Sequence, residues 1–444
     1  MQNANFVNHI VEQYEKLLPF LPGTGNLNVR TLRHQALNEA VKIGLPHPRQ
    51  STWKHALLQP LFDTYPQGVI HPAGKRDYNS LKPFLIDTAR ALSLVFINGF
   101  YTPSLSHKKD KYPEMTLTHF GHLSKTQSDL LYDLLERSFQ SKHFFHLINS
   151  ALISDGALII VPQDYPIDVP IFIYQILINN NSHSTMINTQ THIFVGKNSR
   201  VSVVEKTISL TNEISLLNTQ TFIKADANSQ VNYYHYAEDS AKIYRFTHLN
   251  VHQGFSSQFQ LKLLAHGANY HRLETTLSLL EPETKADCQG LMLPAAQEHI
   301  DWISRLHHQA PNCHSEQIIK SVIGHEGHST FLGNITVKKD AQKTIAHMHN
   351  HNLLLAKGKA DTAPQLEIHA DDVKCNHGAT IGQLDETALF YLRSRGIDEQ
   401  QAKKMLIDAF VQEIFSSEEF IEIEQHFIQK IHQRIEAMIK GENK

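Results

Sequence analysis

The chain of 444 residues is long enough to bury a large core and would ordinarily divide into roughly two to four units. Lys and Arg (41) nearly balance Asp and Glu (44), so charge gives no reason to expect nucleic acid or an anionic membrane as a partner. The three cysteines exclude a disulfide framework, and no apolar run approaches a transmembrane span. Because MQNANFVNHIVEQYEKLL also lacks a signal-peptide pattern, we predict a cytoplasmic protein whose partners are proteins or small ligands.

Residues 1–150 are predicted to form an N-terminal helical region. Apolar residues recur at helical spacing from Phe6 to Leu18, and again from Val29 to Ile43, where Gly44 and Pro46 end the pattern. Leucines at helical spacing predict a further helix over residues 123–149.

Residues 151–383 have the composition and the alternating pattern of β-strands. From Asp155 onward the chain is rich in β-branched and aromatic residues, and alternating apolar positions are separated by turns. Three of these turns carry Asn198, Asn228 and Asn269, at intervals of 30 and 41 residues. A β-solenoid and a β-sandwich both fit this pattern, because the two folds differ only in long-range strand pairing.

Residues 384–444 return to helix. Asp385 is a suitable N-cap, Gly396 a typical C-terminal stop, and Asp398 the N-cap of a second helix. A third helix is expected over residues 418–440, with one apolar side that must pack against another surface.

The sharpest chemical signal is the stretch PQLEIHADDVKCNHGATIGQLDETALFYLRSRGI, residues 364–397. We expect a strand, an acidic doublet and then a compact turn that carries Cys375, His377 and Gly378. Residues two apart on an extended backbone project to one face, so the thiol and the imidazole would lie together. Both are ligand types that bind iron and iron–sulfur species. The alternative is that Cys375 is packed beneath the turn while His377 hydrogen-bonds the backbone.

His347, His349 and His351 in AHMHNHN form a second candidate group. On a strand they would share one face and could bind one metal ion, although a solvated polar face is the favoured interpretation.

Two further histidine-containing segments are not expected to bind metal. HHQAPNCH, residues 307–314, fits none of the usual zinc spacings and is predicted to be a loop. His325 and His328 lie beside glycine turns and are expected to be exposed.

Several catalytic motifs are absent from the sequence. It contains no G-x-x-x-x-G-K-[ST] loop, no G-x-S-x-G elbow and no H-E-x-x-H helix. We therefore expect that the chain does not hydrolyse ATP and is not an ordinary enzyme.

DDVKCNHGATIG, followed by LFYLRSRGI, resembles the SufB/SufD family of the SUF iron–sulfur cluster assembly system. GLPHPRQSTWKHALLQPL, residues 44–61, is similar to a segment near the start of these proteins in which Gly-Leu-Pro precedes Trp-Lys. SufD is favoured over SufB, because CNHGAT stands where SufB-like chains carry an acidic residue, and because neither a cysteine-rich N-terminal segment nor the SufB cysteine before this motif is present.

The resemblance implies a mainly β fold: a right-handed parallel β-helix core over residues 151–383, flanked by N-terminal and C-terminal α-helical regions. It implies a non-enzymatic scaffold that pairs with SufB through the β-helix and binds the ATPase SufC through residues 384–444. A nascent iron–sulfur cluster, or iron itself, would form at the SufB interface with His377 as first ligand and Cys375 as second.

Three other readings stay open beside this one. The chain could be a metal-dependent β-solenoid enzyme that acts on a carbohydrate or small molecule, with His347, His349 and His351 as ligands. It could be a purely structural subunit without a ligand, and the isolated chain could form a homodimer.

Overall fold

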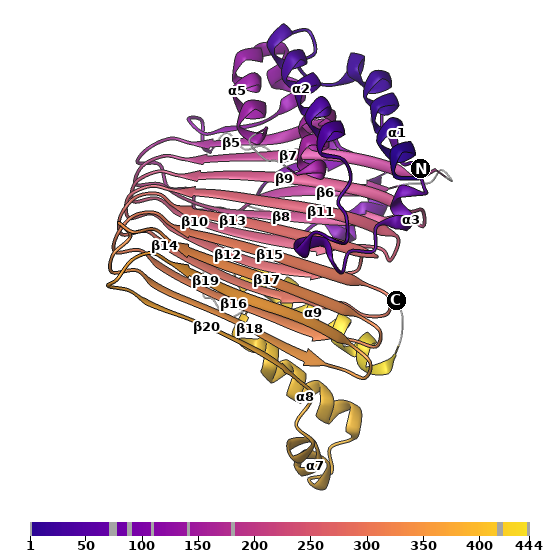
Figure 1. Ribbon diagram of the computed structural model, residues 1–444, viewed down its shortest axis with the longest axis vertical. Helices are drawn as coiled ribbons and strands as arrows, with labels where there is room; N and C mark the ends of the chain where they lie inside the picture. The colour runs from indigo at the N-terminus through magenta and orange to yellow at the C-terminus, as the bar shows by residue number, and fades with distance from the viewer. Residues whose placement is uncertain are drawn as a thin grey trace.

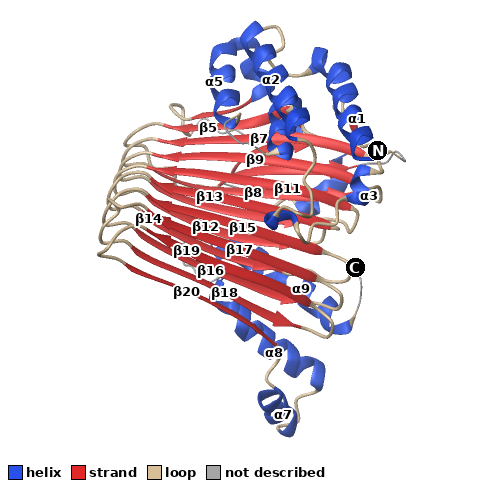
Figure 2. Ribbon diagram, viewed as in Figure 1, coloured by secondary structure: helices blue, strands red, loops and turns tan. Residues whose placement is uncertain are grey.

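The computed structural model describes residues 2–70, 78–86, 91–107, 111–139, 143–178, 183–414 and 421–441. A stack of strands in two sheets forms the centre of the molecule, and helices lie at both ends of the chain (Figure 1; Figure 2). Successive long strands alternate between the two sheets, and each pairs in parallel with the strand one coil earlier. The protein is therefore mainly β with a β-solenoid core, as predicted, and the hand of the coil stays a prediction.

Among the described residues, each sheet has ten strands. Sheet A contains β1 (Gln67–Gly68), β4 (Thr116–His119), β5 (Asp155–Val161), β7 (Thr185–Val195), β9 (Ser215–Ala225), β11 (Ile243–Gln253), β13 (Tyr270–Leu279), β15 (His299–His308), β17 (His328–Val337) and β19 (Lys359–Ile368). Sheet B contains β2 (Leu92–Ile97), β3 (Phe100–Tyr101), β6 (Ile171–Ile178), β8 (Arg200–Leu210), β10 (Gln230–Glu238), β12 (Gln258–His266), β14 (Lys285–Met292), β16 (His314–Ile323), β18 (Ile345–Leu354) and β20 (Lys374–Gly382).

Helices precede, interrupt and follow the strands. The α-helices are α1 (Gln2–Leu17), α2 (Leu27–Ile43), α3 (Gln59–Phe62), α4 (Phe120–Thr126), α5 (Ser128–Ser138), α6 (Phe144–Leu152), α7 (Glu386–Ser394), α8 (Glu399–Val411) and α9 (Ile421–Lys440). Short 3-10 segments are η1 (Leu18–Phe20), η2 (Ser51–Trp53), η3 (Tyr78–Phe84), η4 (Pro103–Leu105) and η5 (Gln412–Ile414). No helix in the described part of the chain is both long enough and apolar enough to cross a membrane.

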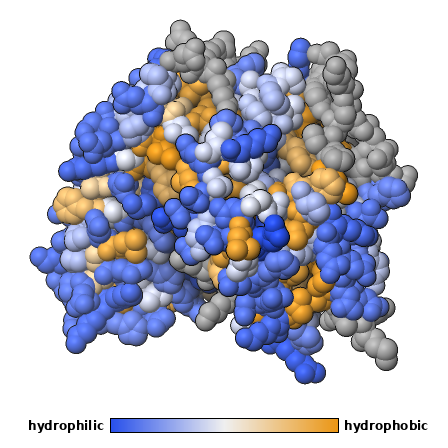
Figure 3. Space-filling view, turned by 90° about the horizontal axis from the view of Figure 1, so that it is seen from above, coloured by the Kyte–Doolittle hydropathy of each residue, from blue (hydrophilic) through white to orange (hydrophobic). Residues whose placement is uncertain are grey.

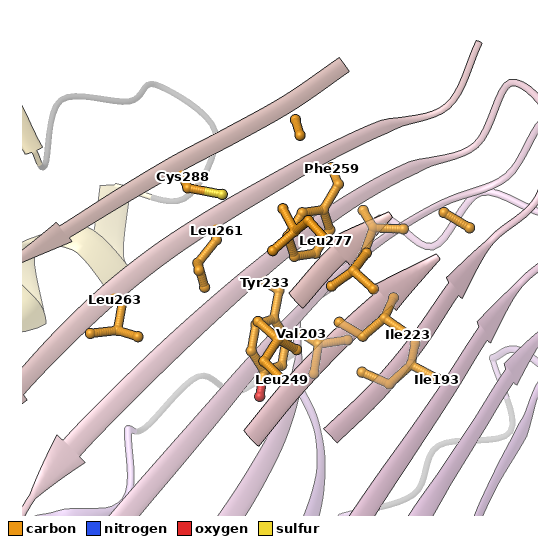
Figure 4. Packing of buried hydrophobic residues seen from close by; sticks show 14 of the residues in the cluster. Ile193, Val203, Ile223, Tyr233, Leu249, Phe259, Leu261, Leu263, Leu277 and Cys288 are labelled. Carbon is orange, nitrogen blue, oxygen red and sulfur yellow. The ribbon is translucent and has the colours of Figure 1, made fainter. Parts of the chain in front are cut away.

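Alternating side chains of both sheets fill the interior of the coil. Ile193 and Ile223 of sheet A and Val203, Tyr233 and Leu261 of sheet B belong to one buried cluster that runs along the stack (Figure 4). Because paired residues in a parallel sheet project to the same face, each coil covers the apolar side chains of the coil before it. The alternation seen in the sequence is thus the signature of this interior.

The turns between strands are stacked as well. Asn198 and Asn228 adopt positive φ values of 56° and 58°, a conformation that Asn tolerates better than most residues. The Asn228 side chain donates to Asn198 Oδ1 at 3.1 Å, and Asn198 donates in turn to Asp164 at 2.7 Å. The third predicted turn residue, Asn269, lies after the positive-φ pair Gly267 and Ala268.

The N-terminal helices cover the outer face of sheet A. One buried cluster joins Phe6, Ile10 and Phe145 to Phe246 and Tyr270 of the sheet. Seen from the end that carries these helices, the described surface is largely hydrophilic and its hydrophobic patches are small (Figure 3). The outer face of sheet A from β7 to β13 is therefore already occupied within the chain.

The C-terminal helix α9 covers part of the outer face of sheet B. Phe427, Ile431 and Ile435 are buried against strand residues such as Tyr236 and Leu264. A buried ion pair, in which Lys262 Nζ lies 2.5 Å from a carboxylate oxygen of Glu424, joins β12 to the same helix. The predicted start of this helix at residue 418 lies outside the described residues.

One prediction about the N-terminal half needs correction. The single helix expected over residues 123–149 is broken into α4, α5 and α6, because Gln127 ends α4 and the buried α6 turns back onto sheet A. There Asn149 donates to the backbone oxygens of Thr189 and Asn218. The N-terminal helical region also contributes strands, since β2 and β4 join sheets B and A.

Candidate functional site

Cys375 and His377 lie on β20, the last strand of sheet B. Cys375 is in register with Ala346 and His377 with Met348, and these two β18 residues are fully buried in the interior cluster. Both candidate ligands therefore project toward the interior of the coil at its final turn. Cys375 is half-buried against the cluster, whereas His377 is exposed. Their common face agrees with the two-residue spacing.

The expectation of a compact turn around these residues was wrong. Residues 374–382 form a continuous strand, and the bend comes earlier, at residues 369–373. Gly378 leaves room for the His349 ring on β18. A Cβ at position 378 would lie 3.2 Å from His349 Nδ1, closer than an ordinary van der Waals contact. The bend itself is fixed to the preceding coil, where Lys343 donates its backbone N–H to the Asp372 carbonyl at 2.6 Å.

The coil ends without a cover among the described residues. There β20 pairs only with β18, and β19, the last strand of sheet A, pairs only with β17 (Figure 1). Ile368 and Ile381 are 40% and 49% exposed at this end. In every earlier coil the next coil covers such side chains. A free strand edge above an uncovered apolar interior is a surface on which another chain can continue the sheet. We call the β19 and β20 end of the stack the open coil end.

The half-buried position of Cys375 affects its chemistry. Burial raises the pKa of the Cys375 thiol, and the backbone hydrogen bond with Ala346 only partly offsets this effect. The thiol is therefore largely protonated at neutral pH and binds a metal as thiolate only when the metal displaces the proton.

Alkylation should distinguish Cys375 from the other two cysteines. Cys288 and Cys313 are 3% and 0% exposed, so iodoacetamide should modify one thiol per native chain and three after denaturation. Because the pKa of Cys375 is raised, its reaction rate should climb at higher pH than that of free cysteine, whose pKa is about 8.5. Mass spectrometry across a pH series checks both points. The Cys375→Ser chain should take up no label while native, and label on Cys288 or Cys313 would contradict the structure.

The three histidines of AHMHNHN lie on the opposite face of sheet B. His347, His349 and His351 alternate with buried residues of β18 and are partly exposed, as their spacing predicts. The rings of His349 and His351 stack at 6.0 Å, and His351 Nδ1 lies 2.9 Å from Thr380 Oγ1. They are therefore separated by the sheet from Cys375 and His377.

The remaining sequence predictions gave mixed results. Residues 309–313 of HHQAPNCH form the expected connection, between β15 and β16, and Cys313 is buried there. His325 is exposed, but His328 is only partly exposed and is hydrogen-bonded to Asp361 at 2.7 Å.

His55 lies beside the same Asp361 carboxylate, with Nδ1 3.6 Å from the oxygen that His328 contacts. Sequence reasoning missed this group, because its members are far apart in the chain.

Comparisons with known proteins agree with this architecture. A family model described as "SUF system FeS cluster assembly, SufBD core domain" matches residues 177–410, which include most of the coil, the open coil end and α7. The iron–sulfur cluster assembly protein SufD of Escherichia coli is 28% identical over 410 residues, covering 90% of this chain and 92% of that protein. A SufBD family protein of Synechocystis is 28% identical over 403 residues, covering 88% of each chain.

SufD of Bacillus subtilis is 24% identical over 398 residues, covering 86% of this chain and 88% of that protein. The family model spans more than half of the chain, and the relatives match it over nearly their whole length. The chain therefore belongs to the SufBD family of SUF-system iron–sulfur cluster assembly proteins and is of the SufD type.

Proposed function

We propose that this chain is a non-enzymatic, cytoplasmic scaffold subunit that pairs with a SufB protein through the open coil end. A nascent iron–sulfur cluster would then be assembled between the two chains. The observation that carries the proposal is the position of Cys375 and His377 on a terminal strand, facing an interior that nothing covers among the described residues. The names of the E. coli and B. subtilis relatives support a role in iron–sulfur cluster assembly, and SufB is the partner that the resemblance to SufD implies.

The ligand set explains why such a cluster could be released. Cys375 and His377 supply two ligands, so a cluster that prefers four must take the others from the partner chain or from solvent. A site divided between two chains opens whenever they move apart. The raised pKa of Cys375 favours release as well, because protonation of the thiolate competes with the metal.

The C-terminal helices are the proposed docking surface for the ATPase SufC. α7 and the beginning of α8 project beyond the last coil (Figure 1), and Phe390, Tyr391 and Met405 on these helices are 73%, 56% and 41% exposed. Large exposed apolar side chains of this kind are typical of protein interfaces. The sequence has no phosphate-binding loop of its own, so any energy from ATP would have to come through such a partner.

Two charged double variants test the two proposed surfaces separately. Ile368→Lys with Ile381→Lys places two ammonium groups on the open coil end, whereas Phe390→Lys with Tyr391→Lys changes α7 by the same number of charges. All four side chains are exposed, so both variants should fold. On co-expression with SufB and SufC, the first should lose SufB and the second should lose SufC, each by about tenfold or more, because buried unpaired charges cost several kcal/mol.

The readout is the ratio of the three chains after affinity purification, measured by quantitative mass spectrometry. Retention of SufB by the Ile368→Lys, Ile381→Lys chain would contradict pairing through the open coil end. The isolated wild-type chain provides a further comparison: if it forms a homodimer through the same end, the first variant should be monomeric in light scattering.

A further inference from the structure

We propose that His55, His328 and Asp361 form a binding site for one divalent transition-metal ion, Zn²⁺ or Fe²⁺. One ligand atom from each residue lies within 4.8 Å of the other two. His55 comes from the N-terminal segment, His328 from β17 and Asp361 from the terminal strand β19. These residues are different from Cys375 and His377, so the inference is independent of the proposed cluster site.

The spacing of the ligand atoms fits one metal ion. Zinc binds imidazole nitrogen and carboxylate oxygen at about 2.0–2.1 Å, which places ligand atoms of a tetrahedral site roughly 3.3 Å apart. In the structure His328 Nε2 lies 2.7 Å and His55 Nδ1 3.6 Å from the same Asp361 oxygen. Shifts of about half an ångström would bring both pairs to the spacing of a tetrahedral site.

His55 is held in place by its neighbours in the chain. Trp53 is buried, its ring stacks on that of His143 at 4.7 Å, and the Arg272 guanidinium lies 3.7 Å from its ring centroid. Arg272 also donates a 2.6 Å hydrogen bond to the Thr52 carbonyl oxygen. The segment that carries His55 is therefore anchored to sheet A, which limits the entropy lost when a metal binds.

His328 is supported from the β15 side. Its ring stacks on that of His299 at 4.1 Å, and His299 Nε2 lies 3.0 Å from Thr330 Oγ1 and 2.7 Å from Asp301 Oδ1. These contacts hold the His328 imidazole with its Nε2 2.7 Å from the Asp361 carboxylate.

The site is partly open to solvent. The side chains of His328, His55 and Asp361 are 21%, 30% and 45% exposed. Two imidazoles and one carboxylate would fill three positions of a tetrahedral metal and leave the fourth to water or to another ligand. The ligand set, with both nitrogen and oxygen donors, suits zinc and ferrous iron better than calcium or magnesium.

A second histidine cluster in the described chain is a poorer metal site. His143, His146 and Glu274 also bring three ligand atoms within 4.8 Å of one another. However, Glu274 already accepts from Arg272 at 2.7 Å and from Arg305 at 3.0 Å. Two guanidinium groups on the only carboxylate would repel a divalent cation. Among the described residues, Asp361 forms ion pairs with His55 and His328 and with no arginine or lysine.

A bound metal ion would connect two parts of the chain. Asp361 belongs to a terminal strand that ends the coil, whereas His55 precedes the first strand of either sheet. The ion would thus fasten the N-terminal segment to β19 and stabilise the folded state by binding it more tightly than the unfolded chain.

Metal titration of the full-length chain tests the proposal. The chain is purified with a chelator in a Cys375→Ser background, so that this thiol cannot contribute, and is titrated calorimetrically with Zn²⁺ or Co²⁺. We expect one ion per chain, ligand-field absorption typical of a low-coordinate Co²⁺ site, and a Zn²⁺-dependent rise in the thermal unfolding midpoint. His55→Ala, His328→Ala and Asp361→Asn should each weaken binding by about tenfold or more and remove the rise.

His369→Ala is the matched control, since His369 is an exposed histidine 2.9 Å from a carboxylate, Glu367, next to the same edge strand. This variant should bind metal as the parent chain does. A folding check is the unfolding midpoint without metal, which should change little for the partly exposed His55. The proposal is overturned if all three ligand variants retain the parent affinity, if His369→Ala loses it equally, or if only removal of His347, His349 and His351 abolishes binding.

Discussion

Lowering the pH from 7 to 5 should reduce the stability of the isolated chain substantially. His192, His235 and His308 are 1%, 2% and 0% exposed, and burial lowers the pKa of each to about 3. In the unfolded chain the same imidazoles have a pKa of about 6.5. Between these two values the unfolded state binds more protons than the folded state, so the free energy of unfolding falls as the pH falls.

The expected size of this effect is large. Each buried imidazole contributes about 1.4 kcal/mol per pH unit below pH 6.5, so three lower the free energy of unfolding by about 4 kcal/mol per unit. The total at pH 5, about 6 kcal/mol, is comparable to the whole stability of many proteins, about 5–15 kcal/mol. Burial also raises the pKa of Glu205 and Glu298, and these two groups raise the free energy of unfolding as the pH falls. Burial lowers the pKa of His146 and His271, which add to the loss of stability.

His235→Leu provides the sharpest test of this pH dependence. Neither ring nitrogen of His235 has a hydrogen-bond partner among the described residues, so the substitution removes a titrating group without breaking a hydrogen bond. The free energy of unfolding, measured by urea titration and circular dichroism at pH 7, 6 and 5, should fall less steeply in the variant, by about 1.4 kcal/mol per pH unit below pH 6.5. At pH 7 to 8, where imidazoles are neutral in both states, the two chains should show no such difference in slope. Equal slopes below pH 6 would contradict this account of the buried histidines.

Local sequence signals predicted local structure well. Asp385 and Asp398 cap α7 and α8 as expected, each accepting hydrogen bonds from two backbone N–H groups of the first turn. Gly396 ends the first of these helices with a φ of 88°. Asn198 and Asn228 occupy the predicted turns. Each of these features depends on side chains within a few residues of the backbone that they organise, so the sequence alone is sufficient.

Features that depend on distant contacts could not be predicted in this way. Strand alternation is the same in a solenoid and a sandwich, and only the resemblance to a family distinguished them. α6 leaves the helical pattern of residues 123–149 because Asn149 and its neighbours are buried against sheet A. β2 and β4 are strands because later strands offer them a partner.

The candidate site shows the same division. Two-residue spacing was enough to place Cys375 and His377 on one face, but it could not show that their strand is the last of the coil. His55, His328 and Asp361 meet only because the coil places β17 next to β19 and because Trp53 fixes the N-terminal segment above them. The spacing of these residues in the sequence cannot predict that their side chains lie close together.

Replacing His377 by Ala should nearly abolish the cluster. His377 is exposed on the interior face of a strand with a free edge, so the substitution leaves packing within the chain almost unchanged and should not weaken pairing with SufB. It removes an imidazole nitrogen ligand that the half-buried Cys375 thiol cannot replace. Loss of a ligand should reduce the bound iron and sulfide by about tenfold or more.

The measurement is iron and acid-labile sulfide per complex, after anaerobic reconstitution of co-purified SufB, SufC and this chain. His369→Ala is the matched control, because His369 is an exposed imidazole in the bend that leads into the same terminal strand. We predict a normal cluster content for His369→Ala and less than about a tenth of it for His377→Ala, with all three proteins present in both complexes. A full complement of iron and sulfide in the His377→Ala complex would contradict the proposal that the open coil end supplies cluster ligands.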